Sequence, residues 1–234
     1  LSVNSCTAAL HLSLISLNLK KGDEVITTPM TFASTINSII LAGGKPVLAD
    51  INEETFNINP ENIIKKITKK TKGIILVHLA GLPCEIKKIN KIAKKNKLFL
   101  IEDCAHSIET KYENKHVGNF GDTGCFSFYS TKNLTTGEGG MVITQNKKLA
   151  DRIRLLRLHG LSKDAWKRNL PASVKFDTKF EHYDVREIGL KYNMIDINSA
   201  IGIIQLKKIE KSLKIIKKIF DNYKKNLSDL PIKF

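Results

Sequence analysis

The chain has 234 residues, enough to bury the core of one large domain, and 42% of them are hydrophobic. Its 38 basic and 23 acidic residues give a formal charge of +15, but the lysines are spread over the polar faces of expected helices without a nucleic-acid recognition motif. These features argue against a nucleic-acid-binding protein and, since no apolar run reaches membrane-spanning length, against a membrane-spanning one.

Strand-like and helix-like segments alternate from the start of the chain. Residues 7–19 predict a largely buried helix, and Asn4, Ser5 and Thr7 can supply its cap. Expected strands then cover 24–28, 46–50, 73–78 and 98–103, and expected helices cover 33–41, 60–68 and 85–96. Strands rich in Ile, Val and Leu that alternate with amphipathic helices are typical of an α/β domain with a mainly parallel sheet.

Polar residues follow several of these strands. Thr28, Asp50, His78 and Asp103 each stand at or just after the end of an expected strand. Because ligands in parallel sheets bind at the carboxyl ends of the strands, we expect a site there.

Lys132 lies on a polar loop between two apolar, β-prone runs, 125–129 and 141–144. Most lysines in such loops are solvated turn residues. The aromatic residues that precede this one, however, would desolvate its ammonium group and favour the neutral amine that carbonyl chemistry needs. Ser127 can bind an anion, and the glycines of 137–140 let the backbone approach a ligand closely. These features together indicate a phosphate-bearing aldehyde, pyridoxal 5′-phosphate (PLP).

Asp103 ends a buried apolar run and is the second candidate. A carboxylate there can accept a hydrogen bond from a protonated pyridine nitrogen, although a helix-capping role alone is the more common use of such a residue. The helix that starts near Thr7 and Ala8 offers free backbone N–H groups, which attract phosphate. Phe32, in the loop after the strand 24–28, could stack on a pyridine ring or belong to the core.

The C-terminal third carries less pattern. A helix is expected over 147–158, a polar loop over 159–187, and a long helical pattern over 194–226. Cys6, Cys84, Cys104 and Cys125 show neither paired spacing nor a histidine at metal-ligand spacing, so we expect reduced thiols, no metal site and a cytoplasmic protein.

Five ordered motifs resemble the DegT/DnrJ/EryC1/StrS family of PLP-dependent sugar-nucleotide aminotransferases. They are Asn4-Ser-Cys-Thr-Ala-Ala-Leu-His, Thr28-Pro-Met-Thr-Phe, Glu102-Asp-Cys-Ala-His, Phe126-Ser-Phe-Tyr-Ser-Thr-Lys-Asn-Leu-Thr-Thr-Gly-Glu-Gly-Gly and Gly189-Leu-Lys-Tyr-Asn-Met-Ile-Asp-Ile-Asn-Ser-Ala-Ile-Gly. The resemblance implies PLP-dependent transferase fold type I, a three-layer α/β/α large domain. It also implies that residues 1–205 form this domain without its complete N-terminus and that 206–234 begin a small domain that is largely missing.

The resemblance assigns roles to individual residues. Lys132 is the lysine that forms the Schiff base, Asp103 pairs with the pyridine nitrogen, and Ser127 binds the phosphate together with Thr7 and Ala8. Phe32 stacks on the ring, and His106 lies beside it. Where many members have an asparagine that reaches the phosphate of the partner subunit, this chain has Lys191, so either Lys191 or Asn193 could make that contact.

The function implied by the resemblance is transfer of an amino group from L-glutamate to a nucleotide-linked keto-sugar. The loop 159–168 resembles that of members that act on UDP-linked 4-keto sugars. A homodimer with shared active sites is also implied. Two alternatives remain open: a sugar dehydratase of the same fold, in which histidine replaces the lysine, and a non-catalytic regulatory or binding member.

Overall fold

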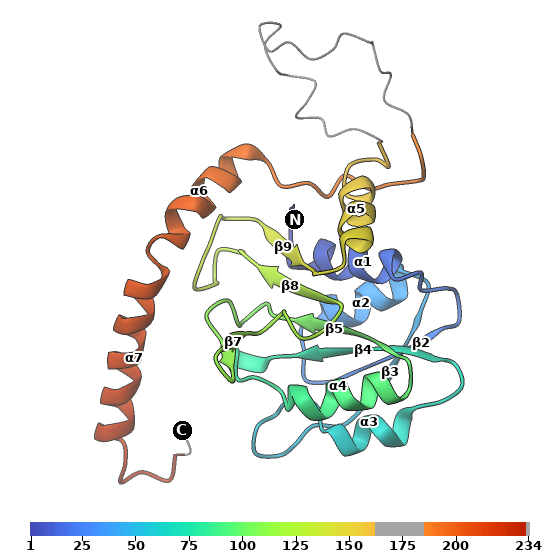
Figure 1. Ribbon diagram of the computed structural model, residues 1–234. Coiled ribbons are helices and arrows are strands. Elements are labelled where there is room, and N and C mark those ends of the chain that lie inside the picture. The colour runs from blue at the N-terminus through green and yellow to red at the C-terminus, as the bar shows by residue number, and fades with distance from the viewer. Residues whose placement is uncertain (162–184, 233–234) are drawn as a thin grey trace, which may run out of the picture.

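A computed structural model describes residues 1–161 and 185–232. Seven strands form one sheet in the order β1-β9-β8-β5-β4-β2-β3 (Figure 1). The strands are β1 Ser2–Val3, β2 Glu24–Thr27, β3 Lys45–Leu48, β4 Thr71–Val77, β5 Phe99–Asp103, β8 Thr123–Ser127 and β9 Gly140–Ile143. β3, β2, β4, β5 and β8 run parallel, and β9 runs antiparallel to both β8 and β1. The predicted α/β architecture with a mainly parallel sheet is confirmed.

Helices cover both faces of the sheet and produce three layers (Figure 1). One face packs against α1 Cys6–Ser16, α2 Ala33–Leu41 and α5 Lys147–Leu156, and the other against α3 Pro60–Lys66 and α4 Ile86–Lys95. Neighbouring strand residues divide between the two cores: Ile75 joins the first and Ile74 the second. Because alternate side chains of a strand point to opposite faces, strands covered on both sides must be apolar throughout.

The helix that the sequence predicts at 7–19 is α1, and nine of its eleven residues are buried. It begins one residue earlier than predicted because Ser5 caps it, accepting a hydrogen bond from the backbone N–H of Ala8 at 3.1 Å. α2 covers 33–41 as predicted.

Four short elements, three strands and a 3-10 helix, were not predicted. β1 has two residues and pairs with β9, and a hairpin joins β6 Lys111–Tyr112 to β7 Lys115–His116. Glu113 and Asn114 form its turn with φ of 48° and 63°, a conformation that glycine usually provides. The 3-10 helix η1 Leu79–Gly81 contains Ala80 at φ 51°.

The helical pattern predicted over 194–226 is divided into α6 Asp196–Leu206 and α7 Ile209–Asn226. No described side chain of either helix is buried, and Figure 1 shows α7 running apart from the sheet. Most of the predicted polar loop, residues 162–184, lies outside the described residues. Among the helices that the structure describes, none combines the length and apolar character needed to cross a membrane.

Candidate active site

A cavity of about 800 Å³ lies at the carboxyl ends of β4, β5 and β8, beside the first turn of α1. Its lining includes six of the residues predicted from the sequence: Thr7, Phe32, Asp103, His106, Ser127 and Lys132. The sheet thus brings together residues that are separated by as much as half the chain, at the edge where parallel strands place ligands.

Asp103 is the last residue of β5, with only 4% of its surface exposed. Its Oδ1 accepts the backbone N–H of Ala105 at 3.1 Å and faces the Cys6 thiol at 3.9 Å, while its Oδ2 accepts the Thr35 hydroxyl at 2.9 Å. A carboxylate has about four acceptor positions, so these three donors leave one position on Oδ2 for a further donor. Burial raises the pKa of Asp103, and the hydrogen bonds from Ala105 and Thr35 oppose that rise.

Lys132 is held in a folded loop between β8 and β9. Its backbone N–H donates to the carbonyl of Tyr129 at 3.0 Å, and the backbone N–H of Thr136 donates to the carbonyl of Phe128 at 2.9 Å. Tyr129 lines the cavity with Lys132, whereas Phe126 and Phe128 belong to the hydrophobic core. Neither of these two phenylalanines lines the cavity, and the expectation that they desolvate Lys132 stays a prediction.

The first turn of α1 forms the end of the cavity that suits an anion. The first intrahelical hydrogen bond runs from the N–H of Ala9 to the carbonyl of Ser5, and the Ser5 hydroxyl oxygen accepts a hydrogen bond from the N–H of Ala8. The N–H groups of Cys6 and Thr7 precede both bonds and remain available to a ligand. Ala8 does not line the cavity, so its phosphate role stays a prediction that its engaged N–H does not favour.

Gly140 allows this helix end to approach the sheet. A Cβ at Gly140 would lie 2.4 Å from the carbonyl carbon of Ser5, closer than real Cβ atoms approach backbone. Because Gly140 pairs with Ser127 across β8 and β9, the same close approach brings Ser127 beside the start of α1.

His106 is oriented by the strained residue Ala80. Its Nδ1 accepts the backbone N–H of Ala80 at 3.3 Å, which assigns the proton of the neutral ring to Nε2. Burial and the positive charge of Lys132 lower the pKa of His106, and Asp103 only partly opposes them. A neutral ring with a free N–H donor therefore lines the cavity next to Asp103.

Behind the cavity, Glu102 has no exposed surface and collects four donors. Its Oε1 accepts the N–H groups of Phe120 and Gly121 at 2.6 and 2.7 Å, and its Oε2 accepts that of Gly118 at 2.7 Å and faces Nε2 of His78 at 3.2 Å. Nδ1 of His78 accepts the N–H of Cys84. Cys104 lies with His78 and Glu102 in a buried group of metal-ligand type, but the hydrogen bonds already engage the His78 and Glu102 ligand atoms.

Lys191 and Asn193 do not line the cavity. Lys191 Nζ donates to Asn193 Oδ1 at 2.6 Å, and the segment is attached to the start of the chain by the N–H of Asn4, which donates to the Tyr192 carbonyl at 2.8 Å. Both side chains therefore stand outside the pocket of their own chain.

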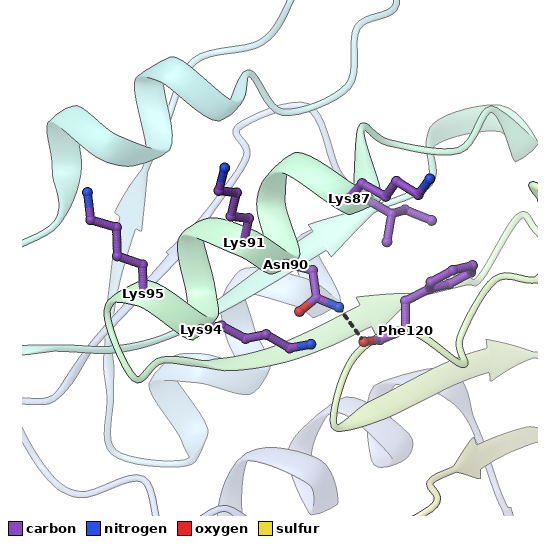
Figure 2. A pocket seen from close by; sticks show the side chains of 7 residues that line it. Lys87, Asn90, Lys91, Lys94, Lys95 and Phe120 are labelled. Carbon is purple, nitrogen blue, oxygen red and sulfur yellow. Dashed lines mark hydrogen bonds between the residues drawn. The ribbon is translucent and has the colours of Figure 1, made fainter.

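A second, more open cavity of about 590 Å³ lies over α4 (Figure 2). Its lining includes Lys87, Lys91, Lys94 and Lys95, and Asn90 Nδ2 donates to the Phe120 carbonyl at 2.9 Å. This is the solvated lysine face predicted for that helix, and it contains no carboxylate or histidine.

Sequence reasoning missed Cys6, Thr31 and Thr35, which contact Asp103 directly or through one another. Thr31 precedes the N-cap of α2 and Thr35 lies on its first turn, four residues later, and their hydroxyls meet at 2.8 Å. That spacing was the available signal, but nothing in the sequence says which carboxylate they meet.

The whole chain, residues 1–234, matches the model of the DegT/DnrJ/EryC1/StrS aminotransferase family. It is 52% identical over 98% of its length to the uncharacterized protein MJ1066 of Methanocaldococcus jannaschii, and 44% identical over 98% to the spore coat polysaccharide biosynthesis protein SpsC of Bacillus subtilis. It spans 59% and 58% of these two proteins.

Solved structures agree in fold. Helicobacter pylori PseC, an aminotransferase involved in the biosynthesis of pseudaminic acid, matches over 99% of this chain and 59% of its own, with a TM-score of 0.87 and 32% identity. The PLP-form of Spr1654 from Streptococcus pneumoniae matches over 98% of this chain and 60% of its own, with a TM-score of 0.86 and 29% identity.

Proposed function

This chain belongs to the DegT/DnrJ/EryC1/StrS aminotransferase family, and from that membership we propose that the whole protein is a PLP-dependent aminotransferase. It moves an amino group from L-glutamate to a nucleotide-linked 4-keto sugar, most simply a UDP-sugar, in the biosynthesis of a surface glycan or deoxyaminosugar. The observation that carries the proposal is the cavity itself, in which a lysine, a buried carboxylate with one open acceptor position and the N-terminal turn of a helix meet.

The residues of the cavity fit PLP. The N–H groups of Cys6 and Thr7, with the Ser127 hydroxyl, suit a phosphate, because a helix N-terminus supplies both donors and a favourable dipole. The open position on Asp103 Oδ2 suits a pyridinium N–H, and Phe32, with 78% of its surface exposed in the cavity wall, supplies a ring to stack on. When bound, PLP supplies an aldehyde that combines with amines and a ring that accepts electrons.

Each residue has its own part in the chemistry. The Lys132 amine would hold the cofactor's aldehyde carbon and, when free, would take and return a proton at the carbon that carries the amino group. Asp103, in its charged form, would pair with a positive pyridine nitrogen. His106, Tyr129 and Leu79 line the same cavity.

We also propose that the protein is a cytoplasmic homodimer whose active sites lie between subunits, and that residues 1–205 form its cofactor-binding domain. Lys191 and Asn193 support the shared site, because they stand outside their own cavity with a lysine amine and an amide available to a phosphate. The boundary near residue 205 is supported by α6 and α7, whose exposed apolar side chains suit packing against a structure other than the cofactor-binding domain.

The test is product analysis with the full-length protein, L-glutamate and a panel of nucleotide-linked keto-sugars. We expect 2-oxoglutarate and an amino sugar in equal amounts, with ping-pong kinetics. A deoxy product without amino transfer would identify a dehydratase, and cofactor binding without turnover on any sugar would identify a non-catalytic member.

A further inference from the structure

Two threonines connect the cavity wall to the buried carboxylate of Asp103. Thr35, on the first turn of α2, has no exposed surface, and its Oγ1 lies 2.9 Å from Asp103 Oδ2. The Oγ1 of Thr31, which lines the cavity, lies 2.8 Å from the Oγ1 of Thr35. The three side chains form one continuous row from the cavity surface to the end of β5.

The direction of these hydrogen bonds follows from counting hydrogens. A hydroxyl has one hydrogen, and a charged carboxylate can only accept. Thr35 must therefore donate its hydrogen to Asp103, and it can meet Thr31 only as an acceptor. Thr31 in turn donates to Thr35, and this donation polarises the Thr35 hydroxyl toward the carboxylate.

We propose that Thr35, oriented by Thr31, is a positioning residue that keeps the Asp103 carboxylate charged and turns its remaining acceptor position toward the cavity. The proposal rests on the proposed function, since it assigns Asp103 as the partner of a cofactor's ring nitrogen. Thr35 saturates one side of Oδ2, so a ligand's donor is left with the other side of the same oxygen.

The charge of Asp103 needs this support because of its surroundings. Burial raises the pKa of the carboxyl group and favours the neutral acid, which could no longer hold a protonated ring nitrogen. The titratable groups that act on or near Asp103 are Cys6 on α1, His78 after β4, Cys104 and His106 after β5, Cys125 on β8, and Lys132 on the following loop. Burial raises the pKa of the three thiols, so they add no negative charge, and their S–H groups are weak donors.

Thr35 carries no charge, yet its hydrogen bond stabilises the charged form of the Asp103 carboxyl group. Hydrogen bonds to a charged group are about twice as strong as neutral ones, so loss of this one should shift the carboxyl pKa by about one unit. Thr31 acts only through Thr35, and its removal should produce a smaller shift in the same direction.

The test compares Thr35→Val, which replaces the hydroxyl by a methyl group of the same size, with Thr35→Ser, which keeps the hydroxyl. Thr27→Val is the matched control, because Thr27 is equally buried and donates to the Ile75 carbonyl at 3.0 Å instead of to Asp103. Each variant is made in the full-length protein. The pKa of Asp103 is measured without cofactor by titrating the 13C signals of labelled aspartate carboxyl groups, with Asp103→Asn identifying the signal.

We expect the pKa of Asp103 to rise by about one unit in Thr35→Val, to return to the wild-type value in Thr35→Ser, and to stay unchanged in Thr27→Val. The temperature of thermal unfolding should fall by a similar amount in the two valine variants, since each loses one buried hydrogen bond. An Asp103 pKa in Thr35→Val equal to that of the Thr27→Val control would overturn the proposal.

A second measurement separates this inference from the proposed function. In protein loaded with PLP, Thr35→Val should move the pH dependence of the visible absorption band in parallel with the Asp103 pKa, and Thr27→Val should not. Wild-type protein that binds no PLP would refute the proposed function while the titration of Asp103 still decides the role of Thr35. A band whose pH dependence is identical in both valine variants would contradict the positioning role.

Discussion

Replacement of Glu102 by glutamine tests whether the structure behind the cavity depends on one buried carboxylate. Glu102→Gln keeps the size of the side chain but turns one acceptor oxygen into an NH2 donor. In either orientation the new NH2 group meets donors: the N–H groups of Phe120 and Gly121 on one side, or that of Gly118 and the His78 ring on the other. We expect a large loss of stability and a loosened 118–121 loop.

The magnitude follows from the four contacts. Two hydrogen bonds to a charged group are lost, and two buried N–H groups are left facing another donor, each at a cost of about 1–3 kcal/mol. Relaxation of the loop recovers part of this, so we expect Glu102→Gln to lower the free energy of unfolding by about 3–5 kcal/mol. That is a large fraction of the roughly 5–15 kcal/mol that stabilises a typical domain.

Urea unfolding at neutral pH measures this loss, with Glu113→Gln as the control. Glu113 is exposed and pairs with Lys87 at 2.7 Å, so the same chemical change should alter stability by less than about 0.5 kcal/mol. A loss in Glu102→Gln below about 1 kcal/mol would refute the reasoning.

The pH dependence gives an independent check of the same residue. Burial alone would raise the pKa of Glu102, but the hydrogen bonds from His78, Gly118 and Gly121 outweigh burial and hold it below the usual 4.5. A carboxyl group with a lowered folded-state pKa stabilises the protein above its unfolded pKa and loses this contribution as the pH falls through the folded pKa. The stability difference between wild type and Glu102→Gln should therefore shrink in acid, and an unchanged difference would contradict the assignment.

Three further predictions concern the cavity. Burial raises the pKa of Asp103 in the folded protein, so the charge of Asp103 opposes folding at pH values above the unfolded pKa. Urea unfolding of the cofactor-free protein should therefore show Asp103→Asn to be more stable than wild type at neutral pH but not at pH 3. Amino transfer should be lost in the same variant. Phe32→Ala should change the free energy of unfolding by less than about 0.5 kcal/mol, because the side chain is exposed. The same change should weaken PLP binding in a fluorescence titration by up to about tenfold, because ring stacking is lost. Ser5→Ala removes the cap of α1 and should cost about 1 kcal/mol in urea unfolding, with equal stability contradicting the capping role.

The sheet and its helices were predictable where burial on both faces determines the sequence. The helix at 33–41 and the strand ending at Asp103 could be placed because apolar periodicity and turn residues agree there. β1 escaped prediction because two residues carry no periodicity, and the β6–β7 hairpin escaped because Glu113 and Asn114 occupy a turn for which glycine is the usual signal.

Residues that line the cavity could be predicted from the sequence, and the residues behind them could not. Lys132 lies on a loop and Asp103 at the end of a strand, and such positions can be recognised from sequence patterns. Thr35 and the four donors of Glu102 depend on which distant segments meet, and a threonine in a helix or a glutamate in a strand looks the same whether or not it finds such partners.

Reduction of the PLP-loaded, full-length protein with borohydride, followed by peptide mapping, tests the central claim most directly. The claim is that Lys132 carries the cofactor, and its motivation is that Lys132 shares one cavity with Asp103, Ser127 and the first turn of α1. We predict a pyridoxyl group on Lys132, loss of both the label and amino transfer in Lys132→Ala, and neither loss in Lys94→Ala, a lysine of the α4 face. A pyridoxyl group on another lysine, or none on Lys132, would contradict the account.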